Sequence, residues 1–125
     1  MRQYFILPLR SRPKPMKPQA AEVFFNDQLA GILQKTGQQY SFRYDPAYLQ
    51  TDLPAVSLTL PKQAAAFVSP VLFSFFYGLL AEGVAKQIQC QELKIDEHDH
   101  FTRLLRTAHT ETIGGVTVRA LLPKP

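Results

Sequence analysis

Residues 56–83, VSLTLPKQAAAFVSPVLFSFFYGLLAEG, constrain the fold more than any other part of this 125-residue sequence. The first five, VSLTL, alternate apolar and polar side chains, which predicts a half-buried strand that ends at Pro61. Ser69 and Pro70 then fit the N-cap and the first position of a helix. The predicted helix, VLFSFFYGLL, is apolar on nearly every side, so either its own core or a second protein must surround it. At about ten residues it is half as long as a membrane span.

The preceding sequence predicts a three-stranded antiparallel meander. Two strand-like runs, residues 21–25 and QLAGILQKT, flank Asn26 and Asp27, which favour a hairpin turn. Gly37 and Gln38 form a second turn into the run QYSFRY. Alternating side chains of a strand lie on the same face, so one face of this third strand should carry Tyr40, Phe42 and Tyr44.

Helices are predicted on both sides of the apolar stretch. Asp45 and Pro46 favour a short helical turn, DPAYLQ. A helix after Gly83 should have three apolar residues near one face: Val84, Ile88 and Ile95. Asp96 can cap a third helix, in which Asp99 suits the positive N-terminal end. That helix carries an i, i+3, i+4, i+7 apolar stripe and two outward arginines: Phe101, Leu104, Leu105 and Ala108, then Arg103 and Arg106.

The end of the sequence completes the predicted fold. Ile113, Gly114 and Gly115 predict a turn into a closing strand, VTVRALL. The order of strands, helices and strand is typical of an α+β domain, with about three helices packed on a small antiparallel sheet. We expect this domain to occupy residues 21–122.

The first 20 residues differ in composition from the rest. Five positive charges and no acid occur in the first 18 residues, whereas the remaining chain has nine Lys or Arg (14 − 5) against ten Asp or Glu. The proline-rich run RSRPKPMKPQ predicts an extended, flexible leader that is dispensable for folding. It is alternatively a docking arm for nucleic acid or an acidic partner, through Arg10, Arg12, Lys14 and Lys17. The apolar run YFILPL could add an edge strand.

The sequence contains no recognisable catalytic or cofactor motif. The single Cys90 excludes an internal disulfide and favours the cytoplasm. His98, Asp99 and His100 have no evident third metal ligand, and a solvated helix start is the simpler interpretation. Phosphate-binding glycine loops and kinase catalytic triplets are absent. We therefore predict no enzyme activity, no metal and no cofactor.

The order of five motifs resembles the N-terminal subdomain of HipA-type serine/threonine kinases. These motifs are FFNDQLAG, YSFRYDPAYL, VSLTLP, FSFFYGLLAEG and FTRLLRTAHTETIGGVTV, which together cover most of the predicted domain. The sequence departs from the family pattern at Tyr77, at Ala81 and in the TIGG turn. The resemblance implies an α+β fold without the ATP site and catalytic aspartates, which the family carries in the following kinase body.

A separate copy of this subdomain is similar to the HipS antitoxins of HipBST toxin–antitoxin systems. That resemblance implies a protein that binds and neutralises a HipT-like kinase toxin, with a HipB-like helix-turn-helix DNA-binding protein in the same complex and no membrane. The alternative is a nucleic-acid-binding component or co-repressor that acts through the basic leader.

The expected partner contacts lie in and after the loop that joins the predicted strand to the predicted core helix: Phe67, Val68, Phe73, Phe76 and Tyr77. Phe67 allows two interpretations. It could fold back as a hydrophobic staple near Phe73, or it could point outward as an aromatic anchor in the partner kinase.

Overall fold

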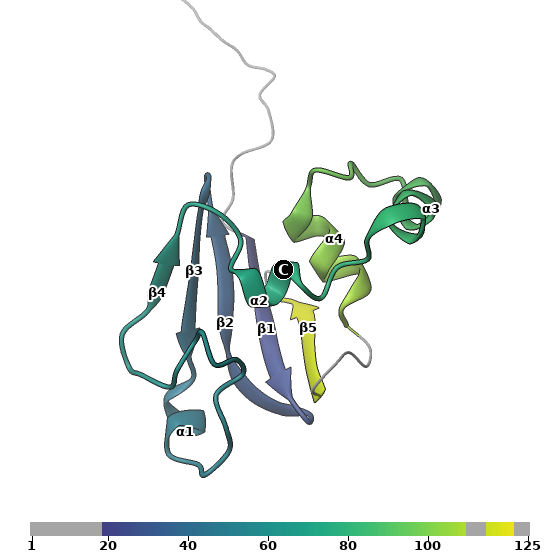
Figure 1. Cartoon of the computed structure of the whole chain (residues 1–125). Coiled ribbons are helices and arrows are strands. Elements are labelled where there is room, and N and C mark those ends of the chain that lie inside the picture. The colour runs from purple at the N-terminus through teal and green to yellow at the C-terminus, as the bar shows by residue number, and fades with distance from the viewer. Residues whose placement is uncertain (1–18, 110–114, 122–125) are drawn as a thin grey trace, which may run out of the picture.

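The computed structural model describes residues 19–109 and 115–121, which form an α+β domain with helices over one face of an antiparallel sheet (Figure 1). The sheet has five strands in the order β4-β3-β2-β1-β5. Their bounds are β1 Gln19–Phe25, β2 Gln28–Thr36, β3 Gln39–Tyr44, β4 Phe67–Ser69 and β5 Val116–Ala120. The helices are α1 Pro46–Leu49, α2 Ser74–Tyr77, α3 Gly83–Leu93 and α4 His100–Thr107. The predicted α+β class is confirmed. The run YFILPL and most of the TIGG turn lie outside the described residues.

The predicted meander of β1, β2 and β3 is confirmed. Asn26 and Asp27 both have positive φ, 47° and 70°, as a two-residue hairpin turn of type I′ requires. Gly37, with φ of 64°, makes the turn between β2 and β3. The closing strand is also confirmed, since β5 pairs antiparallel with β1 and extends the sheet.

The core lies against the face of β3 that carries Tyr40, Phe42 and Tyr44, all of them buried. The ring of Phe76 from α2 lies 5.7 Å from that of Phe42, centroid to centroid. The ring of Phe101 from α4 lies 6.1 Å from that of Tyr40. The helices therefore cover the face that the aromatic alternation of β3 predicts.

The run VSLTL does not form the predicted strand. Residues 57–60 form a tight turn in which Leu60 N donates to Ser57 O at 3.0 Å. The Ser57 and Thr59 hydroxyls lie 2.9 Å apart, and Thr59 N donates to Ser57 Oγ. Local bonds of this kind offer the backbone an alternative to strand pairing. As a result Val56 and Leu60 are buried while Leu58 is fully exposed.

The predicted ten-residue core helix is also wrong. Only the single turn α2 is helical in that region, and Ser69 belongs to β4 instead of capping a helix. Ser69 Oγ accepts a hydrogen bond from Val71 N at 3.1 Å, and Phe73 precedes α2 in an extended conformation. The apolar run is therefore no continuous helix: it enters α2 through non-helical residues 71–73 and leaves it through turns, in which Leu79 N donates to Phe76 O and Leu80 N to Tyr77 O.

The later helices match the prediction in part. The stripe of α4 is confirmed, with Phe101, Leu104 and Ala108 buried. Its cap is Asp99 instead of Asp96, because Asp99 accepts from Thr102 N and from Thr102 Oγ1. Arg106 is exposed as predicted, but Arg103 is buried, with 2% exposed. The predicted apolar face of α3 points to solvent at Val84 and Ile88.

Gly31 in β2 offers a test of this packing. A Cβ there would lie 2.5 Å from the carbonyl oxygen of Arg43 and 2.9 Å from the Phe42 ring, so β2 and β3 would have to separate. We expect Gly31→Ala to lower the free energy of unfolding by about 1–3 kcal/mol. A Cβ at Gly78 would make only ordinary contacts of 3.4 Å, so Gly78→Ala is the matched control. Urea denaturation measures both, and equal stability of the two variants would contradict the packing.

Candidate protein-binding surface

Residues 53–81 form a long, uncharged part of the molecule. Their single charged side chain is Lys62. Its ammonium group donates to the carbonyl oxygens of Thr51 and Leu53, both at 2.8 Å, and lies 5.1 Å from the centre of the Tyr48 ring. The ammonium group of Lys62 therefore interacts with groups of its own domain. A surface depleted of charge is typical of the centre of a protein–protein interface.

Three large apolar side chains of this segment are exposed around the β4 edge of the sheet: Leu58 at 100%, Val71 at 66% and Val68 at 59%. We call these three the edge surface. Beside it a shallow groove of about 220 Å³ is lined by Thr59 and Leu60 of the turn and by residues between Ser69 and Ser74. Of the three, Val71 lines this groove, and Leu58 precedes Thr59, which also lines it. Exposed apolar side chains beside a groove mark a place where another protein can dock.

The structure divides the residues that the sequence indicated as partner contacts. Val68 is exposed, and Tyr77 is exposed at 38%. Phe73 is half-buried and lines the groove. Phe76 is fully buried beneath α2, so it is a core residue and cannot contact a partner. The basic residues Arg10, Arg12, Lys14 and Lys17 lie outside the described residues.

Phe67 fits neither of its two predicted roles as stated. It is part of β4, where it pairs with Phe42 of β3, and its half-buried side chain packs against the core cluster. It is therefore neither a staple on a helix nor an outward anchor. The sequence showed no strand here because β4 is only three residues long.

Sequence reasoning missed Leu58 and Val71. Both were assigned to buried elements because they belong to apolar runs, and an apolar run does not show which of its members face water. The near absence of charged residues from 53 to 81 was the signal that could have identified this surface.

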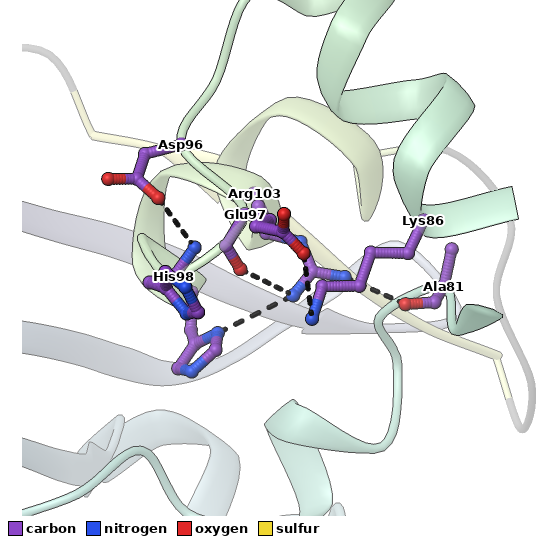
Figure 2. Close-up of polar contacts among 7 residues, drawn as sticks. Ala81, Lys86, Asp96, Glu97, His98 and Arg103 are labelled. Carbon is purple, nitrogen blue, oxygen red and sulfur yellow. Dashed lines mark hydrogen bonds and ion pairs between the residues drawn. The ribbon is translucent and has the colours of Figure 1, made fainter. Parts of the chain in front are cut away.

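The end of the uncharged segment is held by Arg103 (Figure 2). Its guanidinium donates to Ala81 O at 2.7 Å and to Glu97 O at 3.4 Å, and its Nη1 lies 3.4 Å from Nδ1 of His100. Among the described residues, no carboxylate pairs with Arg103 and its Nε has no hydrogen-bond partner. Arg103 therefore ties α4 to two backbone carbonyls that the chain brings together from distant positions.

His100 lies between this junction and the uncharged segment. The ring of Tyr77 meets that of His100 edge-on at 5.0 Å. Burial, followed by the positive charges of Arg103, Lys86 and His98, lowers the pKa of His100 below 6.5, although Asp99 opposes the shift. Because a guanidinium only donates, Nδ1 of His100 is the acceptor, which also favours the neutral ring.

The described residues offer little for catalysis. Among them, no group of three or more His, Cys, Asp or Glu side chains could hold a metal ion. Cys90 is buried in α3. Burial raises the pKa of Tyr40, Tyr44 and Tyr48, which keeps these phenols neutral. In residues 19–109 and 115–121, no helix is long and apolar enough to cross a membrane.

Fold and surface together define a small α+β domain whose most distinctive surface is an uncharged apolar edge. The family model described as "HipA N-terminal domain" matches residues 21–119, and the chain belongs to this family. Its relatives include an uncharacterized protein of Haemophilus influenzae, 30% identical over 100 residues that cover 80% of this chain and 91% of that protein. A solved "N-terminal domain of HipA toxin" matches with a TM-score of 0.64 and 28% identity, over 85% of this chain and 95% of that one. The chain is thus related to the HipA toxin–antitoxin components.

Replacing Arg103 tests whether its hydrogen bonds to Ala81 O and Glu97 O stabilise the fold. An ammonium group cannot reach both Ala81 O and Glu97 O as the guanidinium fork does, so one of these two carbonyls loses its donor in Arg103→Lys. We expect this variant to lose about 1–3 kcal/mol of unfolding free energy in urea denaturation. Arg106→Lys, on the exposed side of the same helix, is the control and should change it little. Equal unfolding free energies for the Arg103→Lys and Arg106→Lys variants would mean that the hydrogen bonds of the buried guanidinium do not stabilise the fold.

The lowered pKa of His100 predicts that stability depends on pH. The unfolded chain binds the proton near pH 6.5 while the folded ring stays neutral, so this contribution is complete above pH 6.5 and is lost as the pH falls below it. We expect the thermal midpoint to fall between about pH 7 and pH 5, and His100→Gln to reduce that fall. His109→Gln, at an exposed position, is the control. If the thermal midpoint of the His100→Gln variant depends on pH just as that of the wild type does, the lowered pKa does not belong to His100.

Proposed function

We propose that this chain is a HipS-type antitoxin that binds a HipT-like serine/threonine kinase toxin and neutralises it. The edge surface carries the proposal, because a member of the HipA N-terminal domain family that exposes an uncharged apolar edge is suited to bind another protein. In this role the chain supplies the subdomain that the kinase lacks and is not itself an enzyme.

The comparisons support this proposal from two sides. The solved relative is named as one domain of the HipA toxin, so in that protein a domain of this fold belongs to a larger toxin. The relative from Haemophilus influenzae is matched over 91% of its length, so a chain of similar size occurs there. A domain on a separate chain has no covalent link to its partner, so surface contacts alone must hold the two together.

The chemistry of the edge surface sets the character of the complex. Leu58 and Val71 would bury apolar area against an equally uncharged surface of the kinase, and half-buried Phe73 lines the same groove as Val71. Burial of apolar area is insensitive to moderate salt, unlike contacts between opposite charges. We expect an interface on the order of 1,200–2,000 Å² in total, as in other stable complexes.

The composition of the basic leader supports a second proposed role, binding to nucleic acid or to an acidic partner. Its five positive charges within 18 residues are suited to nucleic acid or to an acidic partner. In a cytoplasmic complex with a HipB-like DNA-binding protein, the leader would add phosphate contacts without being needed to bind the kinase.

Charged substitutions in the edge surface test the proposal. Leu58→Asp and Val71→Asp place a carboxylate where the kinase would bury apolar area, and each should weaken binding by about 2 kcal/mol or more and restore kinase activity. Both side chains are exposed, so the thermal midpoint should stay the same within a few degrees. Val84→Asp makes the same change at an equally exposed valine of α3 and is the matched control.

Isothermal titration with the purified kinase and an autophosphorylation assay measure the two effects. Full inhibition by the Leu58 and Val71 variants would show that the kinase is not bound through this edge. A loss of inhibition on adding moderate salt to the wild-type complex would implicate the leader instead.

A further inference from the structure

The two edges of the sheet are β4 and β5, and the backbone of the β5 edge is closed (Figure 1). Opposite residues of an antiparallel pair alternate between exchanging hydrogen bonds and not, so one bond fixes the direction of the others. Leu121 N donates to Ala20 O of β1 at 2.9 Å, and by alternation the N–H and C=O of Val118 face away from β1. There Val118 N donates at 2.7 Å to the carbonyl oxygen of Ala108, the C-cap of α4. The domain thus satisfies the outward N–H of Val118 with a carbonyl of its own.

The direction of the backbone in β3 follows from one bond in the same way. Asp45 N donates to Ala30 O at 2.8 Å, and the register of β2 and β3 places these two residues opposite each other. Asp45 therefore bonds to β2, and so does every second residue of β3 before it. The residues between them, which include Phe42 and Tyr40, direct their N–H and C=O groups away from β2 and toward β4.

The strand β4 consequently bonds to β3 through its first and last residues. Phe67 lies opposite Phe42, and Ser69 lies opposite Tyr40. Val68 lies between them, so its N–H and C=O point outward from the sheet. Within the described part of the chain, no backbone hydrogen bond outside the pairing with β3 involves β4. This edge therefore lacks the covering carbonyl that closes the β5 edge.

The side chains around the β4 edge leave it open to another strand. Sheet edges in native proteins are commonly guarded by charged side chains, by proline or by a covering segment. From residue 63 to residue 71 the sequence is QAAAFVSPV, without a charged side chain, whereas β5 carries Arg119. The proline of this run, Pro70, follows the strand instead of lying within it. The outward backbone of Val68 is therefore available for strand pairing.

We propose that the partner kinase adds an extended, uncharged segment to the outer edge of β4, as a sixth strand of the sheet. The N–H and C=O of Val68 form hydrogen bonds with the backbone of that segment. One residue of the segment lies beside Ser69, and its apolar side chain points to the same face, into the groove lined by Ser69, Val71 and Phe73. In strand addition the backbone bonds supply affinity, and such side-chain contacts supply specificity. This mode of binding rests on the proposed antitoxin function.

A second copy of this chain is a poorer occupant of the edge. Symmetric antiparallel pairing of two β4 strands about Val68 would place Pro70 of each copy opposite Ala66 of the other. Proline has no N–H, so both of these pairs would lack a hydrogen bond. A segment of another protein meets Pro70 only once. The edge therefore favours a partner segment over self-association.

Val68→Pro tests the strand addition, because it removes the outward N–H and leaves the bonds between β3 and β4 in place. Val68→Ala keeps that N–H and shortens the side chain, so the difference between the two variants measures the backbone contact. In isothermal titration with a purified HipT-like kinase, we expect Val68→Pro to bind at least about ten times more weakly than Val68→Ala. Ala120→Pro removes an outward N–H of β5 and is the control at the other edge.

Amide exchange of the wild-type chain tests the same contact without a substitution. Addition of the kinase should slow exchange of the Val68 amide at least about tenfold, and unchanged exchange on binding would overturn strand addition. Equal affinities of Val68→Pro and Val68→Ala, while Leu58→Asp still weakens binding, would also overturn it but leave the proposed antitoxin function standing. No binding of the wild-type chain to the kinase would overturn both. Slow exchange of the Val68 amide before the kinase is added would overturn strand addition too, since a second copy or another segment of this chain would then occupy the edge.

Discussion

The hydroxyl of Tyr44 is the contact on which the rest of the structure depends. It donates to Leu60 O and accepts from Val56 N at 3.0 Å, so a side chain of β3 satisfies one backbone group at the end of the turn at residues 57–60 and one just before it. The ring is buried beside those of Phe42 and Tyr48, at 4.9 and 6.0 Å between centroids. Buried backbone groups without partners are costly, and here the sheet itself supplies the partners. The turn can therefore lie against the core without belonging to a strand.

This arrangement explains how the domain can expose an apolar edge and remain folded. Tyr44 holds the uncharged segment near its beginning, and Arg103 holds its end at Ala81. Between these points the pairing of β4 with β3 and the burial of Leu60, Leu72 and Phe76 fix the backbone. Leu58 and Val71 are then left outside without weakening the core. Buried and exposed apolar residues thus share one segment, which is why the segment is apolar almost throughout.

The sequence predicted those elements whose signals are local. Asn26 with Asp27, and Gly37, mark the turns of the meander through the backbone conformations that those residue types adopt. The stripe of α4 follows from its spacing alone. The apolar residues after Val56 were misassigned because alternation and short apolar runs do not separate a strand or a long helix from turns and short irregular segments held by contacts distant in sequence. Arg103 was misplaced for the same reason, since the carbonyl of Ala81 that draws it inward is 22 positions away. Of the candidate contacts, Val68 and Tyr77 could be read from the sequence, whereas Leu58 and Val71 required the fold.

The central claim is that the uncharged edge is the surface through which this domain binds a kinase. Methyl cross-saturation NMR of the full-length chain, mixed with a purified HipT-like kinase, measures this directly. Saturation should transfer from the kinase to the methyl groups of Leu58, Val68 and Val71, and should persist at moderate salt. Transfer confined to Val84 and Ile88, with the signals of the edge unchanged, would contradict the account.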